Sequence, residues 1–378
     1  MASRTTPNEG IGRAGAATLR RLSRIDPAGH PVLSVYVDLD PARFATAGAR
    51  ASERTALLTE ARHRAGGDRD TRADVEAVAE LLESTPDLER GAAALACFSV
   101  QPIGVLEVVA LPRAVPSVVG VDTIPWLAPL ASAGGVEGVL VAVVDRRGAR
   151  LLRDDAGHLV ETDAIRDPVH GRHDQGGWSQ SRYQRGIEEQ VAAHVRHVAA
   201  AVQAADAAVR FDHLVVVAAP TLWPLLRRAL PRSARERLIG LVEHDAADAT
   251  EAEIAELVAP VLEDARARRL NAVLARIGDT VRRHGAIGLA AVLEALNAER
   301  AEALVVDPTA SLRARRCPHC DALFAPPLER CPADDHALRE VDAVQHAVHR
   351  AARQDADVVV ASDPRLVALG GIAAQMRW

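Results

Sequence analysis

The chain contains no lysine, so all 45 of its Lys and Arg residues are arginines. The absence of lysine excludes a phosphate-binding loop of the Walker type, and no strand is followed by a glycine fingerprint for dinucleotides. Aromatic residues make up only 3% of the chain. Chemistry driven by a bound nucleotide is therefore not indicated, and each aromatic residue outside the core is of interest.

Long apolar runs are also missing. No stretch of about eighteen apolar residues occurs, and the first ten residues are polar. We therefore expect a soluble, cytoplasmic protein without a membrane or DNA partner. The formal net charge of -6 further implies that any RNA contact depends on local basic patches.

The 378 residues, 48% of them apolar, are enough for two or three separate cores. Prolines between residues 112 and 129 indicate a first boundary. We expect a mixed α/β (α+β) protein with three domains, at residues 1–130, 131–270 and 271–378.

The second domain opens with three strand patterns separated by turns, which predicts an antiparallel meander. The expected strands cover residues 136–144, 149–153 and 158–162. Alternating strand and helix patterns follow, with strands near 213–218 and 238–242. An amphipathic helix is indicated from Ile187, because apolar residues recur at helical spacing with polar residues such as His194 between them.

The most informative segment lies just before this helix, within a polar loop at residues 170–185. Two glycines, Gly176 and Gly177, stand beside Gln175, and a Trp, a second Gln and two arginines follow. Paired glycines allow positive φ and close approach to a ligand. The N-terminus of the following helix offers N–H groups to an anion. Aromatic and arginine side chains together are typical of a surface that contacts bases and phosphates.

The stretch Gly-Gly-Trp-Ser-Gln-Ser-Arg-Tyr-Gln-Arg at 176–185 resembles the Gly-Gly-Gln loop of archaeal-eukaryotic peptide release factors. Trp178 occupies the position of the catalytic Gln of those factors. The Gln-Gly-Gly-Ser-Gln pattern of Vms/ANKZF-type peptidyl-tRNA hydrolases also matches if Trp178 is an insertion. The likeness is greatest to the bacterial members of this superfamily. It puts forward Gln180 as the catalytic amide, with Gln175 as a second candidate beside Gly176 and Gly177.

This resemblance implies an RNase H-like release-factor middle domain, followed by a C-terminal α/β domain. It also implies a peptidyl-tRNA hydrolase that acts on stalled ribosomes or large subunits, with rRNA and peptidyl-tRNA as partners and a GTPase as an optional one. The expected RNA contacts are Arg172, Trp178, Arg182, Tyr183 and Arg185. The alternative is a release-factor homologue without catalysis that binds the ribosome as a rescue or hibernation adapter, with Trp178 as a plug.

Simpler interpretations remain open for the same loop. Its Arg and Trp side chains could pack on their own domain, as in any surface connection. His170, His173 and Asp174 have a spacing that a metal could use, but in a polar loop we interpret them as solvated side chains. A serine hydrolase is not indicated, because no strand-Gly-x-Ser-x-Gly turn surrounds the serines.

Four cysteines are present, and three of them lie in an insert at residues 315–337 that is similar to a zinc ribbon. Cys317 and Cys320 have the two-residue spacing of a zinc knuckle. Cys331 begins a second, incomplete one, in which Asp334 stands where a cysteine belongs. We favour His336 as the fourth ligand of a structural zinc, with Asp334 as the alternative and a metal-free, decayed ribbon as the other interpretation. The remaining Cys97 is expected to be a buried small residue.

Overall fold

The computed structural model describes residues 12–84, 92–155, 158–167, 180–246, 248–280 and 284–378. The chain divides into two compact units, each with its own sheets. Unit 1 consists of residues 1–135 and 268–378, and unit 2 of residues 136–267. The mixed α/β class expected from the sequence is confirmed in both.

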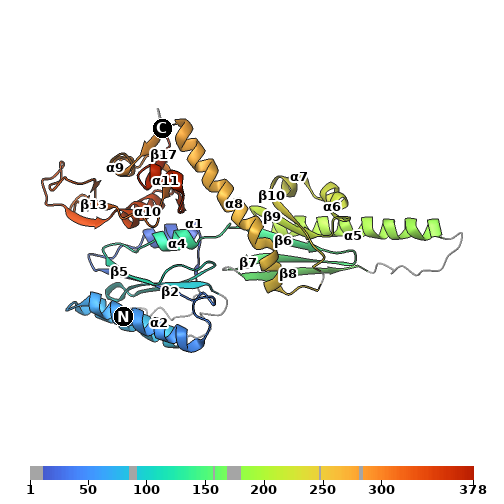
Figure 1. Cartoon of the computed structure of the whole chain (residues 1–378), viewed down its shortest axis with the longest axis horizontal. Coiled ribbons are helices and arrows are strands. Elements are labelled where there is room, and N and C mark those ends of the chain that lie inside the picture. The colour runs from blue at the N-terminus through green and yellow to red at the C-terminus, as the bar shows by residue number, and fades with distance from the viewer. Residues whose placement is uncertain (1–11, 85–91, 156–157, 168–179, 247, 281–283) are drawn as a thin grey trace. The chain divides into compact units, whose positions relative to one another are not determined.

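Unit 2 is built on one five-stranded sheet (Figure 1). Its strands are β6 (Val139–Val144), β7 (Gly148–Asp155), β8 (His158–Arg166), β9 (His213–Ala218) and β10 (Leu238–Glu243). Their order in the sheet is β10-β9-β6-β7-β8. The first three in this order are parallel, whereas β6, β7 and β8 form the predicted antiparallel meander. A mixed sheet with helices is what the resemblance to an RNase H-like middle domain implied.

Helices cover both faces of this sheet. They are α5 (Gln180–Ala208), α6 (Trp223–Ala229), α7 (Arg232–Glu236) and α8 (Glu251–Thr280). Alternate residues of β6 point to opposite faces. Leu140 and Ala142 pack with α5, α6 and α7, while Val141 and Val143 pack with the beginning of α8. Because both faces are covered, all six residues of β6 are buried.

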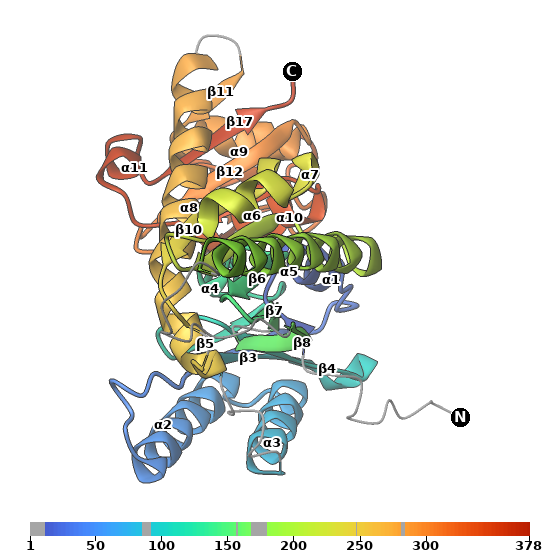
Figure 2. The ribbon, with the colours of Figure 1, turned by 90° about the vertical axis from the view of Figure 1, so that its right-hand side faces the viewer.

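The first part of unit 1 also contains a five-stranded sheet, in the order β1-β4-β3-β2-β5. Its strands are β1 (Gly12–Arg13), β2 (Val32–Asp38), β3 (Ala94–Val100), β4 (Val105–Leu111) and β5 (Val118–Asp122). The helices are α1 (Ala16–Ser23), α2 (Ala47–Ala65), α3 (Arg69–Ser84) and α4 (Ala128–Ala133), with a short 3-10 helix at Gln101–Ile103. Figure 2 shows α2 and α3 side by side on one face of the sheet. Cys97 is fully buried in β3, as expected, and this burial raises the pKa of its thiol to about 12.

The second part of unit 1 holds a four-stranded and a three-stranded sheet. The larger one has the order β11-β17-β12-β16, with β11 (Gly285–Ile287), β12 (Ala301–Val306), β16 (Asp357–Val360) and β17 (Ile372–Met376). The smaller one has the order β14-β13-β15, with β13 (Arg313–Arg316), β14 (Leu323–Phe324) and β15 (Arg339–Asp342). The helices are α9 (Leu289–Asn297), α10 (Ala343–Arg353) and α11 (Pro364–Ala368).

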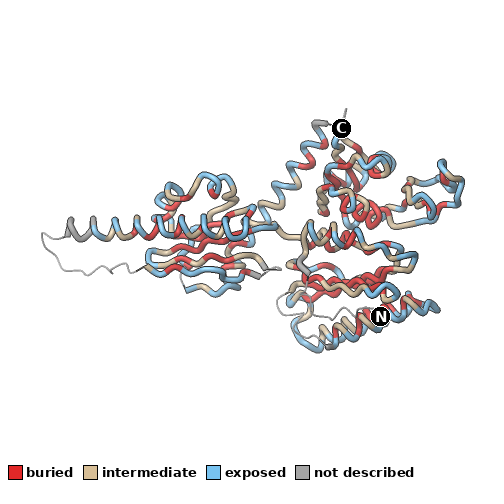
Figure 3. The backbone as a smooth tube through the Cα atoms, turned by 180° about the vertical axis from the view of Figure 1, so that it is seen from behind, coloured by how far each residue is buried: buried red, intermediate tan, exposed pale blue. Residues whose placement is uncertain are grey.

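One apolar cluster joins the two parts of unit 1. It includes Tyr36 and Phe98 of the first part, and Leu304 and Val348 of the second. Figure 3 shows that buried residues run along the strands and along the helices that pack on them. The proposed division of these residues into a first and a third domain stays a proposal. Among the described residues, no helix is both long and apolar enough to cross a membrane.

Gly371 precedes β17 in a turn that only glycine fits. Its φ of +79° lies in the left-handed region, and a Cβ atom there would come within 2.8 Å of the Cβ atom of Ala310. The carbonyl of Gly371 accepts a hydrogen bond from the amide of Asp307 at 2.9 Å. The turn therefore fixes where β17 enters the sheet beside β12.

We expect Gly371→Ala to lower the free energy of unfolding by about 2–4 kcal/mol, because backbone strain and overpacking add. Urea unfolding of the full chain measures this loss. Gly29→Ala is the matched control, since Gly29 has a similar φ of +86° but open space around the position of a Cβ atom. We expect the control to lose only about 1 kcal/mol. Equal losses in the two variants would contradict a role for close packing at Gly371.

Candidate functional site

The predicted contact loop connects β8 to α5 in unit 2. Gly176, Gly177, Gln175, Trp178 and Arg172 lie outside the described residues, as do His170, His173 and Asp174. The structure describes α5 from Gln180 onward, which puts Gln180, Arg182, Tyr183 and Arg185 at the beginning of this helix. The side chains of residues 180–185 also lie outside the described part. The roles assigned to all of these residues stay predictions.

The described end of β8 is tied to α5 by a histidine pair. Asp167, the last described residue before the loop, extends the β7 and β8 pairing by donating its amide to the carbonyl of Arg147 at 2.8 Å. Its carboxylate is hydrogen-bonded to Nδ1 of His194 at 2.7 Å and to Nδ1 of His197 at 3.1 Å. Both histidines lie on α5, one turn apart. We call Asp167, His194 and His197 the loop clamp.

His194 is the buried member of the loop clamp, with a relative exposure of 1%. Its other ring nitrogen, Nε2, contacts the carbonyl oxygen of Gly148 in β7 at 3.2 Å. A carbonyl can only accept, and the hydrogen bond from His194 holds the pKa of Asp167 below its ordinary value, so its carboxylate also accepts. Nδ1 of His194 therefore donates to the Asp167 carboxylate, and the contact of Nε2 with Gly148 holds the ring against β7.

The sequence placed His194 among the polar residues of the helix, and the structure corrects this. His194 lies between the buried Val191 and Val195, and it faces the sheet together with them. Only its hydrogen bonds to Asp167 and Gly148 allow a polar ring at this position. The signal in the sequence was a histidine one residue from an apolar position, which does not by itself separate a buried ring from an exposed one.

A cavity of about 630 Å³ lies at the same end of the sheet, beside the loop clamp. Arg147, Arg150 and Arg166 contribute to its walls, together with Glu161 and Asp248. Arg150 is engaged with Glu161, whose Oε2 lies 2.5 Å from its Nε. Arg147 and Arg166 line the cavity without a counter-ion in the described part of the chain. The base of the predicted loop thus presents two guanidinium groups that are available to a ligand.

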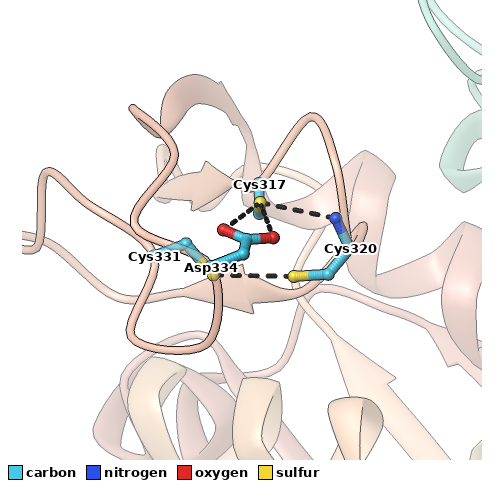
Figure 4. A group of neighbouring side chains, drawn as sticks. All are labelled: Cys317, Cys320, Cys331 and Asp334. Atoms are coloured by element: carbon cyan, nitrogen blue, oxygen red, sulfur yellow. Dashed lines mark hydrogen bonds between the residues drawn. The ribbon is translucent and has the colours of Figure 1, made fainter.

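The second candidate site is the cysteine insert of unit 1, where Cys317, Cys320, Cys331 and Asp334 point toward one another (Figure 4). Their ligand atoms all lie within 4.8 Å of one another. Sγ of Cys320 is 3.5 Å from Sγ of Cys331, and Sγ of Cys317 is 3.3 Å from Oδ2 of Asp334. Cys317 and Cys331 are buried.

The two halves of this cluster have the same backbone geometry. Asp321 donates its amide to the carbonyl of Cys317 at 3.1 Å, and Asp335 donates to Cys331 at 2.9 Å. Both aspartates have positive φ, 62° and 58°. Each half is therefore a knuckle of the same length, and Asp334 occupies in the second knuckle the place of Cys320 in the first.

His336, favoured from the sequence as the fourth ligand, lies outside this group of four. Its Nδ1 is 3.2 Å from Oδ1 of Asp334, and Nδ1 of His319 is 2.9 Å from Oδ2. The two imidazole rings are stacked, with their centroids 4.8 Å apart. The structure thus brings Asp334 to the three thiols and places both histidines next to its carboxylate. This arrangement favours Asp334 as the fourth ligand, the alternative left open by the sequence.

Comparison with known proteins gives one family match. Residues 125–263 match the family described as bacterial archaeo-eukaryotic release factor family 10. This segment includes the whole of the predicted loop, the loop clamp and the sheet of unit 2. No curated protein matches the chain.

Several solved structures are similar to the chain. The archaeal translation termination factor aRF1 is 14% identical, with a TM-score of 0.24 over 96% of this chain and 98% of that one. Pelota of Archaeoglobus fulgidus is 16% identical, with a TM-score of 0.38 over 75% and 79%. Dom34 of S. cerevisiae, described as interacting with Hbs1, is 9% identical, with a TM-score of 0.39 over 75% and 79%.

We expect Asp167→Asn to lower the stability of unit 2 by about 1–3 kcal/mol at pH 7, because buried His194 loses its charged acceptor. The hydrogen bond from His194 lowers the pKa of Asp167 in the folded state. The ionised carboxylate therefore stabilises the fold fully above its unfolded-state pKa of about 3.9, and this stabilisation is lost as the pH falls through the lower folded-state pKa. The difference between wild type and variant should therefore shrink below about pH 4. Urea unfolding at several pH values, followed by hydrogen exchange of β7, β8 and α5, measures it.

His197→Ala is the control for this experiment, because His197 contacts the same carboxylate with a side chain that is 57% exposed. We expect it to cost less than about 1 kcal/mol. A difference between Asp167→Asn and wild type that stays constant from pH 7 to about pH 3 would contradict a charged clamp.

Proposed function

The chain belongs to the bacterial archaeo-eukaryotic release factor superfamily through residues 125–263, and we propose that it hydrolyses the ester between a nascent peptide and tRNA on the ribosome. The observation that carries this proposal is the family match over the segment that holds the Gly-Gly loop. The substrate is peptidyl-tRNA on stalled ribosomes or large subunits, and the site of action is cytoplasmic. A GTPase partner is part of the proposal only as an option.

The chemistry follows from what the loop can position. Water attacks the ester carbonyl, the bond to the ribose oxygen breaks, and the proton of the water ends on that oxygen. The side-chain amide of Gln180, or that of Gln175 in its place, orients the water and donates to the departing oxygen. The glycines Gly176 and Gly177 let the backbone approach the ester closely. No covalent enzyme intermediate is required.

RNA contacts hold the loop in place in this proposal. Arg182 and Arg185, three residues apart on α5, bind phosphates of rRNA or tRNA, and Arg172 adds a third guanidinium. Trp178 and Tyr183 stack on unpaired bases. The loop clamp supports this arrangement, because it ties the residue that follows β8 to α5 and so sets where the loop leaves the sheet. The free Arg147 and Arg166 lie at the same end.

A second candidate function is a ribosome-binding adapter without catalysis. Trp178 favours it, because an indole at the position of the release-factor Gln cannot orient water through an amide. In this case the same RNA contacts remain and the loop fills the peptidyl-transferase centre. The two functions differ in whether the bound protein releases peptide.

We also propose that Cys317, Cys320, Cys331 and Asp334 hold a structural Zn²⁺. Three thiolates and a carboxylate are a donor set that zinc accepts. Zinc about 2.3 Å from each sulfur in a tetrahedron separates its donors by roughly 3.5–3.8 Å, close to the 3.5 Å between Cys320 and Cys331. The ion would join the two knuckles, and His319 and His336 would orient the carboxylate from behind.

The hydrolysis test adds purified protein to large ribosomal subunits that carry labelled peptidyl-tRNA and measures released peptide. We expect Gln180→Ala to slow release on the order of 10²-fold, because the amide that orients water is lost. Gln175→Ala and Trp178→Ala are measured alongside. The matched control is Gln203→Ala, which removes an exposed amide from the same helix and should leave release unchanged.

The outcomes of this assay separate the two functions. Tight binding to subunits without peptide release selects the adapter. Full activity in the Gln180, Gln175 and Trp178 variants alike would overturn the proposed chemistry.

The metal test measures zinc in the purified protein by mass spectrometry. We expect about one equivalent in the wild type and in His336→Ala, and much less than half in Cys317→Ser and Asp334→Ala. Asp334→Cys should retain the metal, because it completes a four-cysteine site. Loss of zinc in His336→Ala but not in Asp334→Ala would instead identify His336 as the fourth ligand.

A further inference from the structure

A dense group of arginines lies between β9 and β10 of unit 2. Arg227, Arg228, Arg232 and Arg235 fall within nine consecutive residues, and no Asp or Glu occurs between residues 219 and 235. Arg227 and Arg228 form the last turn of α6, and the other two lie on α7. We call these four residues the α6–α7 arginine surface. It is strongly positive in a chain whose overall charge is negative.

These side chains are available to a partner. All four residues are exposed. The side chains of Arg227, Arg228 and Arg235 form no ion pair or hydrogen bond with any described residue. Arg232, whose side chain is 87% exposed, pairs with Glu236 across one turn of α7, a contact that contributes little when exposed. Arg237 behaves differently, since it pairs with Asp206 and lies over the ring of Phe211.

The apolar residues of the two helices turn the arginines outward. Leu222, Leu226 and Leu230 recur every fourth residue and are buried against α5 and the sheet. Arg227 and Arg228 are rotated by roughly 100° and 200° around α6 from Leu226, which directs them to solvent. On α7 the buried residue is Ala234, so its arginines also lie on the outer side. Only Leu230 and Pro231 separate the helices, so all four arginines lie within four residues of one junction.

The chemistry of this surface fits the backbone of RNA. Guanidinium groups bind phosphates with two parallel hydrogen bonds, and several phosphates in a row match several arginines in a row. An interface with a protein would need an apolar centre. Leu225, 38% exposed, is the one large apolar side chain exposed in the described part of these two helices.

We propose that the α6–α7 arginine surface binds phosphates of ribosomal RNA, as a second contact besides the loop. This inference rests on the proposed function, because it takes the ribosome as the partner. α6 packs on α5, and α5 carries the contact loop at its beginning. Both contacts thus belong to one helical layer on the same sheet, and binding at one restrains the other. The surface supplies affinity and orientation, and it takes no part in the chemical step.

The test compares binding of the full chain to purified large ribosomal subunits at several salt concentrations. The variant combines Arg227→Gln, Arg228→Gln and Arg235→Gln. We expect binding on the order of tenfold weaker near 0.1 M salt, and a plot of log K against log salt that is shallower by about 2, since each lost phosphate contact removes roughly 0.7–0.9 from the slope. Peptide release at saturating protein should be unchanged.

The matched control removes three arginines of unit 1 that are held in ion pairs, by Arg62→Gln, Arg64→Gln and Arg365→Gln. It changes the net charge by the same amount, and its affinity and salt slope should equal those of the wild type. Equal affinity and slope in the α6–α7 variant would overturn the inference while leaving the proposed function intact.

A wild-type chain that does not bind subunits at all would instead contradict the proposed function. The same proteins are then compared on a short RNA duplex and on polyglutamate. Weaker, less salt-dependent binding of the variant to the duplex supports an RNA surface. Binding to polyglutamate alone, lost in the variant, overturns it in favour of an acidic protein partner.

Discussion

The burial of one face of α5 against the sheet of unit 2 is the constraint on which both proposed RNA contacts depend. Val191, Val195, Val198 and Val202 pack on β6, β7 and β9, and this fixes the middle of the helix. Because the middle of α5 is held against the sheet, the direction in which the helix runs toward the loop is set relative to β8. The same packing seats Leu226 and therefore α6.

The loop clamp adds a polar restraint to this apolar one. His194, placed between the Asp167 carboxylate and the carbonyl of Gly148, joins α5 to β7 and to the residue that follows β8. Apolar contacts alone tolerate small shifts of a helix, whereas a buried charged hydrogen bond with a fixed partner does not. A loop that must place an amide against an ester requires a base with a fixed position, since small misplacements of a catalytic group reduce rates strongly.

The cysteine insert shows how a decayed pattern in the sequence can retain its geometry. The second knuckle has lost a cysteine, yet Asp334 lies at the corresponding position, with the same backbone hydrogen bond and the same positive φ in the following residue. A carboxylate oxygen thereby meets the three sulfurs. The sequence named both His336 and Asp334, because spacing along the chain does not say which side chain turns inward.

The sequence by itself determined the strands of unit 2 and its helix α5, and it carried the resemblance to the release-factor loop. The apolar run of β6, the turns that bound β7 and β8, and the three- and four-residue spacing of apolar residues in α5 depend on neighbours along the chain, so they can be read from it. The burial of His194, its partnership with Asp167 and Gly148, and the inward turn of Asp334 were decided only by the tertiary structure. These features depend on contacts between residues far apart in the sequence or on the direction in which a side chain points. Local propensity determines neither the contacts nor the direction. The α6–α7 arginine surface depends on sequence and tertiary structure together. The sequence supplies its arginines, and the packing of Leu222, Leu226 and Leu230 turns them outward.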